Sequence, residues 1–131
     1  MAKIKQFTIA IENRPGAVAE IAKILGNAKV NILALLGTAL GTAGTLQLIA
    51  EDVSRAKKVL DDAGLTYTEI AAHEYELQNK PGALADCLEK LSAKGINLNS
   101  IYATVPKSGK KAVVVYSAEA EAAEAAATAS A

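Results

Sequence analysis

Apolar side chains recur along the chain with two periods, first every second residue and then every third or fourth. In residues 3–11 the positions of one parity carry most of the large apolar groups, including Phe7 and Ile9. Such alternation is typical of a strand with one buried face. The pattern therefore predicts a strand over 3–11.

The next apolar positions have the spacing of an amphipathic helix. They are Val18, Ile21, Ala22 and Leu25, with polar residues between them. Asn13 to Gly16 breaks the strand before this stripe. Pro15 suits the first helical position, because its missing N–H would be unpaired there anyway. We predict a helix over about 15–27.

Four further elements are predicted before residue 78. They are a buried strand over 30–36, a strand over 45–51 after a turn at 37–44, a helix that Asp52 caps and Gly64 ends, and an extended segment over 65–77. The order strand, helix, strand, strand, helix, strand is that of the ferredoxin-like fold.

The second half of the chain repeats the first at an offset of 66 residues. The segment Asn13-Arg14-Pro15-Gly16-Ala17 returns as Asn79-Lys80-Pro81-Gly82-Ala83, and Asn31-Ile32 returns as Asn97-Leu98. A period this long with two copies indicates a duplicated domain rather than a solenoid. We predict an α+β protein made of two ferredoxin-like units, an antiparallel sheet with the helices on one face.

The second copy departs from the first at its end. Its tail is nearly all Ala and Glu, which gives strong helix propensity but a shallow apolar face. When the elements of the first unit are shifted by 66 residues, the second unit is predicted to lack a last strand of its own. Residues 65–77 then serve both units, and strand 3–11 stands in for the missing strand. This predicts one six-stranded antiparallel sheet with domains 1–70 and 71–131; the alternative is that a second chain supplies the strand.

Composition narrows the class of protein. The 131 residues carry 14 basic and 14 acidic side chains, and 51% of them are hydrophobic, as in ordinary soluble domains. No stretch has the positive charge that nucleic-acid binding needs, and no stretch is apolar enough to span a membrane. The first residues are unlike a signal peptide, and a single cysteine suits a reducing compartment. We predict a cytoplasmic protein that binds neither nucleic acid nor membranes.

Residues that commonly carry catalysis are scarce. With one histidine, His73, and one cysteine, Cys87, neither a zinc site nor a catalytic triad can be composed. Cys87 falls on the helical apolar stripe and is predicted to be buried, whereas His73 is predicted to be a solvated strand residue. We predict no metal, no cofactor and no enzymatic activity. A small enzyme that uses Glu12, Lys80 and His73 is the weakest alternative.

The doubled pattern resembles the ACT domain, present twice over nearly the whole chain. The resemblance rests on the two Asn-Arg/Lys-Pro-Gly-Ala loops between a strand and a helix, and on Asn31 and Asn97 at the start of the next strand. ACT domains are regulatory modules that bind amino acids and related small ligands, usually between two such domains. The resemblance therefore implies a regulatory protein that binds an amino acid.

Serine-sensing ACT domains, which regulate a dehydrogenase of serine biosynthesis, suggest which residues bind. There the loop after the first strand offers an Asn, and a second Asn comes from the start of the second strand of the neighbouring domain. Asn13 or Asn79 matches the first, and Asn31 or Asn97 matches the second. Those members also use a His two residues before the loop Asn, where this chain has Ile11 or Leu77. The departure argues against serine and for a less polar ligand or a different mode.

The residues of the repeat have the chemistry that an amino acid requires. A helix that starts at the proline presents unpaired N–H groups to a carboxylate, and the following glycine lets a ligand approach the backbone. An Asn side chain both donates and accepts hydrogen bonds. Ile32, Leu33, Leu98 and Ile101 supply an apolar wall. The candidate ligand-binding residues are Asn13, Arg14, Pro15, Gly16, Ala17, Asn31, Ile32, Asn79, Lys80, Pro81, Gly82, Ala83, Asn97 and Leu98.

Two functions are compatible with this pattern. The first is a sensor that binds an amino acid and passes the signal to a partner enzyme or regulator. The second is a module for protein–protein interaction or dimerisation, in which the niches are vestigial and Pro-Gly is turn chemistry. Edge strands beginning near Val30 and Ile96 are natural pairing surfaces, so a homodimer is expected in either case.

Overall fold

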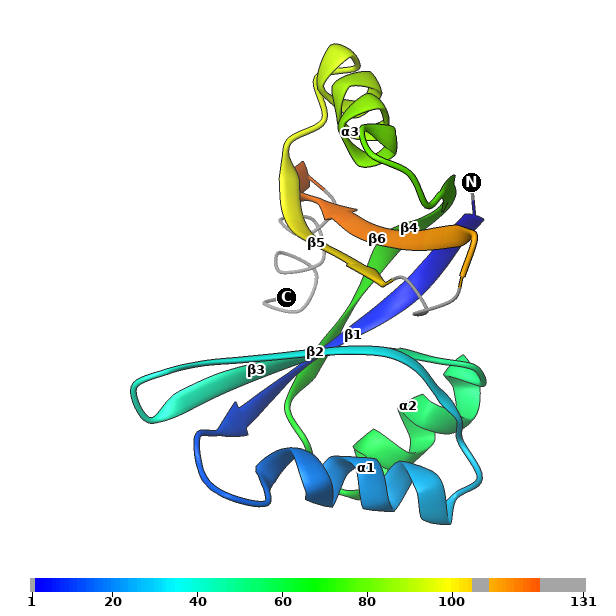
Figure 1. The fold of residues 1–131 in the computed structure, drawn as a ribbon. Coiled ribbons are helices and arrows are strands. Elements are labelled where there is room, and N and C mark those ends of the chain that lie inside the picture. The colour runs from blue at the N-terminus through cyan, green and yellow to red at the C-terminus, as the bar shows by residue number, and fades with distance from the viewer. Residues whose placement is uncertain (1, 105–108, 121–131) are drawn as a thin grey trace. The chain divides into compact units, whose positions relative to one another are not determined.

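The structure is a computed structural model, and it describes residues 2–104 and 109–120. These ranges hold six strands and three helices (Figure 1), in the order β1 (Ala2–Glu12), α1 (Ala17–Asn27), β2 (Ile32–Leu40), β3 (Ala43–Ala50), α2 (Val53–Asp62), β4 (Tyr67–Gln78), α3 (Ala83–Ala93), β5 (Leu98–Thr104) and β6 (Lys111–Ala118). The hydrogen-bonded strand order is β2-β3-β1-β4-β6-β5. The predicted α+β class and the six-stranded antiparallel sheet are confirmed.

Two compact units divide the chain. One comprises Lys5–Ile70, and the other comprises residues 71 onward together with the first residues of β1, up to Ile4. Strands β1 and β4 therefore each contribute residues to both units. Between α2 and α3 the described chain has β4 as its one strand, where two separate ferredoxin-like units would need two.

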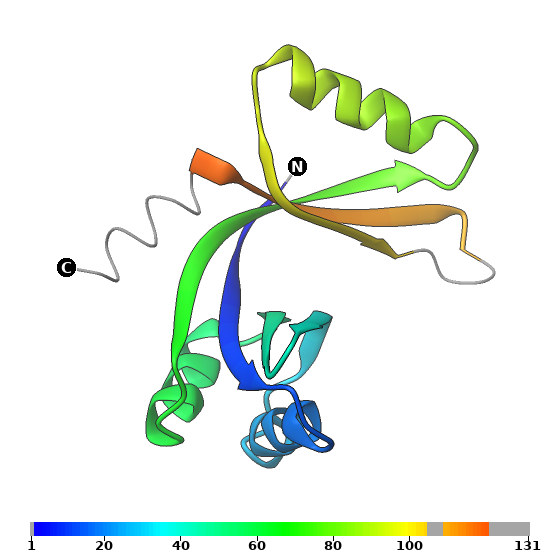
Figure 2. The same ribbon diagram turned by 90° about the vertical axis from the view of Figure 1, so that its left-hand side faces the viewer.

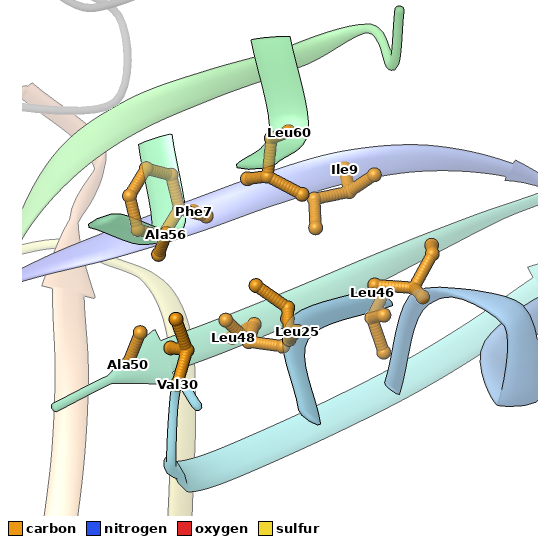
Figure 3. Packing of buried hydrophobic residues seen from close by; sticks show 10 residues of the cluster. Phe7, Ile9, Leu25, Val30, Leu46, Leu48, Ala50, Ala56 and Leu60 are labelled. Carbon is orange, nitrogen blue, oxygen red and sulfur yellow. The ribbon is translucent and has the colours of Figure 1, made fainter. Parts of the chain in front are cut away.

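The core of the first unit lies between one face of its strands and helices α1 and α2. Figure 3 shows side chains of β1 and β3 meeting those of both helices, and Figure 1 shows the two helices on the same side of the strands. Phe7, Ile9, Leu46 and Leu48 are completely buried, as are Leu25 and Leu60. The alternation that predicted β1 is confirmed, because Phe7 and Ile9 point into this core. The helical stripe that predicted α1 is confirmed at Val18, Ile21 and Leu25, whereas Ala22 is exposed.

The second helix of this unit begins and ends as predicted. Asp52 is its N-cap, and the Asp52 carboxylate accepts a hydrogen bond from the backbone N–H of Arg55 at 3.0 Å. Gly64 follows the C-cap with a φ of +70°, the left-handed conformation that glycine adopts readily.

The start of α1 differs from the prediction. Gly16 has φ +86° and ψ −8°, and the N–H of Ala17 donates to the carbonyl of Arg14 at 3.3 Å. A left-handed residue cannot lie inside an α-helix, so Pro15 and Gly16 form a turn before the helix, in the arrangement that Pro-Gly favours. The prediction that Pro15 is the first helical residue was wrong. The second copy repeats the turn, with a φ of +87° at Gly82.

Strand β2 also differs from the prediction. It was expected to be buried over 30–36, but it covers Ile32–Leu40 at an edge of the sheet. Its Leu33, Leu35 and Leu40 are 59%, 43% and 90% exposed. The expected turn at 37–44 shrinks to two residues, because Leu40 already pairs with Ala43 and Gly41 has a φ of +65°.

In the second unit, α3 covers β4 and β6 (Figure 2). Cys87 of the helix is buried, as predicted, and so are Leu91 of the helix and Val114 and Tyr116 of β6. His73 was expected to be solvated, but its ring stacks on that of Tyr116 with a centroid distance of 5.0 Å. Apart from residues 119–120, the predicted tail helix lies outside the described residues.

Candidate functional site

The loop between β1 and α1 is fastened to the β2–β3 turn by Asn13. Its backbone N–H donates to the carbonyl of Thr42 at 3.0 Å, and its side-chain Nδ2 donates to the carbonyl of Gly41 at 2.7 Å. The side-chain Oδ1 accepts no hydrogen bond from the described part of the chain. Asn13 therefore has a structural role and still presents an acceptor.

Asn79 repeats this arrangement in the second copy. Its backbone N–H donates to the carbonyl of Lys110 at 2.8 Å, and its Nδ2 donates to the carbonyl of Gly109 at 3.1 Å. The same hydrogen bonds in both copies show that the repeated Asn holds the loop against the following hairpin.

The start of α1 leaves backbone donors without partners. The Glu20 N–H bonds to the Gly16 carbonyl at 2.9 Å, but the N–H groups of Val18 and Ala19 form no hydrogen bond within the ranges that the structure describes. No side chain caps this end of the helix. These donors lie where a helix presents the positive end of its dipole.

Two hollows lie beside this loop, both within the first unit. The larger, of about 280 Å³, is bounded by the end of β1, the first turns of α1 and the connection Gly64–Thr66. The smaller, of about 230 Å³, lies between the loop and residues 37–39 of β2. Glu12, Arg14 and Ala17 border both hollows. Their volumes are near the lower end of those of small-molecule sites, so each suits a small ligand.

Arg14 is held by two carboxylates at the edge of both hollows. Its Nε donates to Glu12 Oε2 at 2.9 Å, and its Nη1 and Nη2 donate to the two oxygens of Glu20 at 3.1 and 2.8 Å. The hydrogen bonds from the Arg14 guanidinium lower the pKa of the Glu20 carboxyl, and those carboxylates raise the pKa of Arg14. The predicted site residue Arg14 is thus an ordered cation with a fixed orientation.

The second copy has different side chains at the equivalent positions. Gln78 replaces Glu12, Lys80 replaces Arg14 and Asp86 replaces Glu20. Lys80 forms no ion pair with any residue that the structure describes. The two repeats therefore share their backbone geometry but not their charges.

Asn31 and Asn97 lie at the other end of their units. The Nδ2 of Asn31 donates to Glu51 Oε2 at 3.2 Å, and Asn97 bonds in the same way to Glu119. Nine residues of β2, about 30 Å of extended chain, separate Asn31 from the turn that holds Asn13. One unit does not bring its two candidate Asn residues together, so a site that contains both needs two units.

The predicted apolar wall does not border the two hollows. Ile32 packs against the core, Leu33 is exposed, and Leu98 and Ile101 are on β5 in the other unit. The larger hollow has apolar walls from Ile11, Ile21 and Leu65 instead. The sequence did not single out Glu20 or Leu65, because the turn before α1 brings Glu20 to Arg14 and tertiary folding brings Leu65 to the loop.

Comparisons with known proteins agree with this fold. A family model described as an ACT domain pair matches residues 2–128. The chain is similar to a Bacteroides thetaiotaomicron protein of known crystal structure, with 29% identity and a TM-score of 0.82 over 89% of this chain and 80% of that one. No curated protein matches the chain.

More distant solved structures share the fold. The ligand-free regulatory subunit of aspartate kinase from Thermus thermophilus has 16% identity and a TM-score of 0.65, over 95% of this chain and 89% of that one. The aspartokinase alpha and beta subunits have 16% identity and a TM-score of 0.58, over 88% of this chain and 86% of that one.

None of the helices in the described ranges is long and apolar enough to cross a membrane.

Proposed function

Since the chain belongs to the family of ACT domain pairs, we propose that it is a regulatory protein that binds an amino acid and acts on a partner protein, without catalysis of its own. Its two domains are assigned to residues 1–70 and 71–131, with the strand between α2 and α3 shared. Its single cysteine, Cys87, is buried and free, which agrees with a cytoplasmic location.

The observation that carries the proposal is the loop of the first unit with its two hollows. Its polar groups match a zwitterion at either hollow. Beside the smaller hollow, the Val18 N–H is a donor suited to a carboxylate and Asn13 Oδ1 is an acceptor suited to an ammonium. Beside the larger hollow, Arg14 is a cation suited to a carboxylate and Glu20 is an anion suited to an ammonium. Ile11 and Leu65 add an apolar wall on which a side chain can lie. A small-molecule site needs such polar groups to fix the orientation of its ligand and an apolar wall to contact the rest of it.

A homodimer would complete this site. Strands β2 and β5 are the edges of the sheet, and β2 exposes Leu33 and Leu35. Exposed apolar edge strands pair readily with another chain. If two copies of β2 pair antiparallel, the start of one strand lies beside the end of the other, because the strands run in opposite directions. Asn31 of one unit would then approach the Asn13 loop of another.

Such a site would couple ligand binding to the arrangement of the units. A ligand that contacts two units stabilises only the arrangement in which both contacts exist, and it shifts the population by its difference in affinity. The partner protein would then recognise that arrangement. This mechanism needs no reaction at the loop.

The alternative is an interaction module with vestigial niches. The side-chain amides of Asn13 and Asn79 already donate to the hairpin carbonyls, so they would be retained for folding alone. The two functions predict different results when free amino acids are added. A sensor binds at least one of them, whereas an interaction module docks onto its partner without them.

Isothermal titration of the full chain with each of the twenty amino acids tests the proposal. We expect saturable heat from at least one of them, and a higher melting temperature in its presence. A sample with a cooperative melting transition that gives no heat and no shift with any of the twenty would favour the interaction module.

A further inference from the structure

Arg14 stands between the two hollows with its guanidinium fully engaged. Glu12 accepts a hydrogen bond from Nε. Glu20 accepts one from Nη1 and one from Nη2, so its carboxylate contacts the guanidinium at two points. Glu20 borders only the larger hollow, whereas Arg14 borders both. The Arg14–Glu20 contact therefore occupies the place where a ligand in the larger hollow would meet a cation.

The two-point contact is the one that a guanidinium makes with any carboxylate, including that of an amino acid. Resting on the function proposed above, we propose that Arg14 and Glu20 form an exchangeable ion pair that recognises the ligand. The ligand's carboxylate takes Glu20's place on Arg14, and the released Glu20 carboxylate accepts the ligand's ammonium.

Charge balance supports this exchange. Arg14, Glu12 and Glu20 together carry a net charge of −1, which disfavours a simple anion. A zwitterion adds no net charge and replaces one ion pair by two. Glu12 keeps its hydrogen bond to Nε during the exchange, so the guanidinium stays oriented while its outer edge changes partner.

Exposure makes the exchange possible. The side chains of Arg14 and Glu20 are 43% and 63% exposed, so water reaches the pair and screens it. Such a pair contributes little to stability and reopens easily. A side chain on the ligand would lie along Ile11, Ile21 and Leu65, so the favoured class is an α-amino acid with an apolar side chain.

The second repeat lacks this recognition pair. Lys80, at the position of Arg14, carries a compact ammonium and not a planar guanidinium that can donate two parallel hydrogen bonds. Asp86 forms no ion pair with Lys80 in the described part of the chain. The first repeat is thus the one that binds in this mode.

Matched substitutions in the two repeats test the inference by titration with the twenty amino acids. Glu20→Gln and Arg14→Gln should each weaken binding of the best ligand about tenfold or more, as expected for lost hydrogen bonds to charged groups. Asp86→Asn and Lys80→Gln, at the equivalent positions, should change it less than about twofold. The amide and the N-acetyl derivative of the same amino acid, each missing one charge, should not bind.

The outcomes separate this inference from the proposed function. If no amino acid binds the wild-type protein, both fail. If one binds and Glu20→Gln or Arg14→Gln leaves its affinity unchanged, the recognition pair fails and the sensor function stands. An equal loss in Asp86→Asn or Lys80→Gln would also overturn the assignment to the first repeat. If the Arg14→Gln protein melts well below the wild type, its binding result is set aside, and the Glu20→Gln protein alone tests the recognition pair, because Glu20 is exposed.

Discussion

At the scale of single residues, the proposed ligand binding depends on which side chains the folded loop brings to Arg14. Glu20 is six residues further on, and only the turn at Pro15 and Gly16 brings it back within 2.8 Å of the guanidinium. The sequence showed Arg14 and the turn residues as a motif but not the ion pair, because the partners depend on the path of the loop. The repeated Asn residues were found, but their hydrogen bonds to the hairpin were not.

The Arg14–Glu20 pair predicts a dependence of stability on pH. Because the folded state lowers the pKa of Glu20, the pair stabilises the protein above the ordinary carboxyl range, and this contribution is lost as the pH falls through the lowered value. Glu20→Gln should therefore reduce the melting temperature slightly at neutral pH and leave it unchanged in strong acid. In an Arg14→Gln background the same substitution should have no such effect, and an unchanged effect there would contradict the pairing.

Gly16 gives a second prediction at this scale. Its φ of +86° is unfavourable for a side chain, so Gly16→Ala should destabilise the protein by roughly 1–2 kcal/mol in urea unfolding. Gly26→Ala is the control, because Gly26 is helical and exposed with no atom near the added Cβ. That change should stabilise the protein by about 0.5–1 kcal/mol. Equal changes in the free energy of unfolding at the two glycines would contradict the left-handed turn at Gly16.

At the scale of elements, periodicity predicted where the helices and strands lie better than where they begin. The stripe of α1 and the alternation of β1 and β3 follow directly from residues that point into one core. The start of α1 was misplaced, because proline fits both a first helical turn and a preceding turn. The apolar run of β2 predicts a buried strand, because apolar residues on an edge strand have the same pattern as apolar residues in a core.

The core predicts a contrast between two leucines of the same hairpin. Leu48 of β3 is completely buried and Leu40 of β2 is 90% exposed. Leu48→Ala should lower the free energy of unfolding by about 2–5 kcal/mol, through lost transfer energy and a cavity. Leu40→Ala should change it by less than about 0.5 kcal/mol. Similar losses at the two positions would contradict the orientation of β2 and β3.

At the scale of the whole molecule, the repeat and the short segment between the helices were enough to predict one six-stranded antiparallel sheet. Residues 65–77 are too few for two strands, and the structure has one, β4. No sequence pattern could show whether Asn31 approaches the loop of another unit, because the proposed contact depends on association. The apolar edge of β2 is the described feature that favours a dimer.

The proposed dimer gives a prediction for β2. Leu33 and Leu35 are exposed on this edge, so Leu33→Lys with Leu35→Lys should convert a dimer to a monomer in sedimentation equilibrium. A charge change at an exposed position of α2, Lys58→Glu, should leave the mass unchanged. A doubly substituted protein with the wild-type mass would contradict pairing through β2.

The central claim is that the loop of the first unit holds a small zwitterion, and crystallography of the full chain soaked with apolar amino acids addresses it most directly. We predict electron density for one amino acid in the larger hollow, with its carboxylate on the Arg14 guanidinium. The claim would be contradicted if crystals soaked at saturating amino acid showed no ligand density at either repeat and kept the Arg14–Glu20 contact.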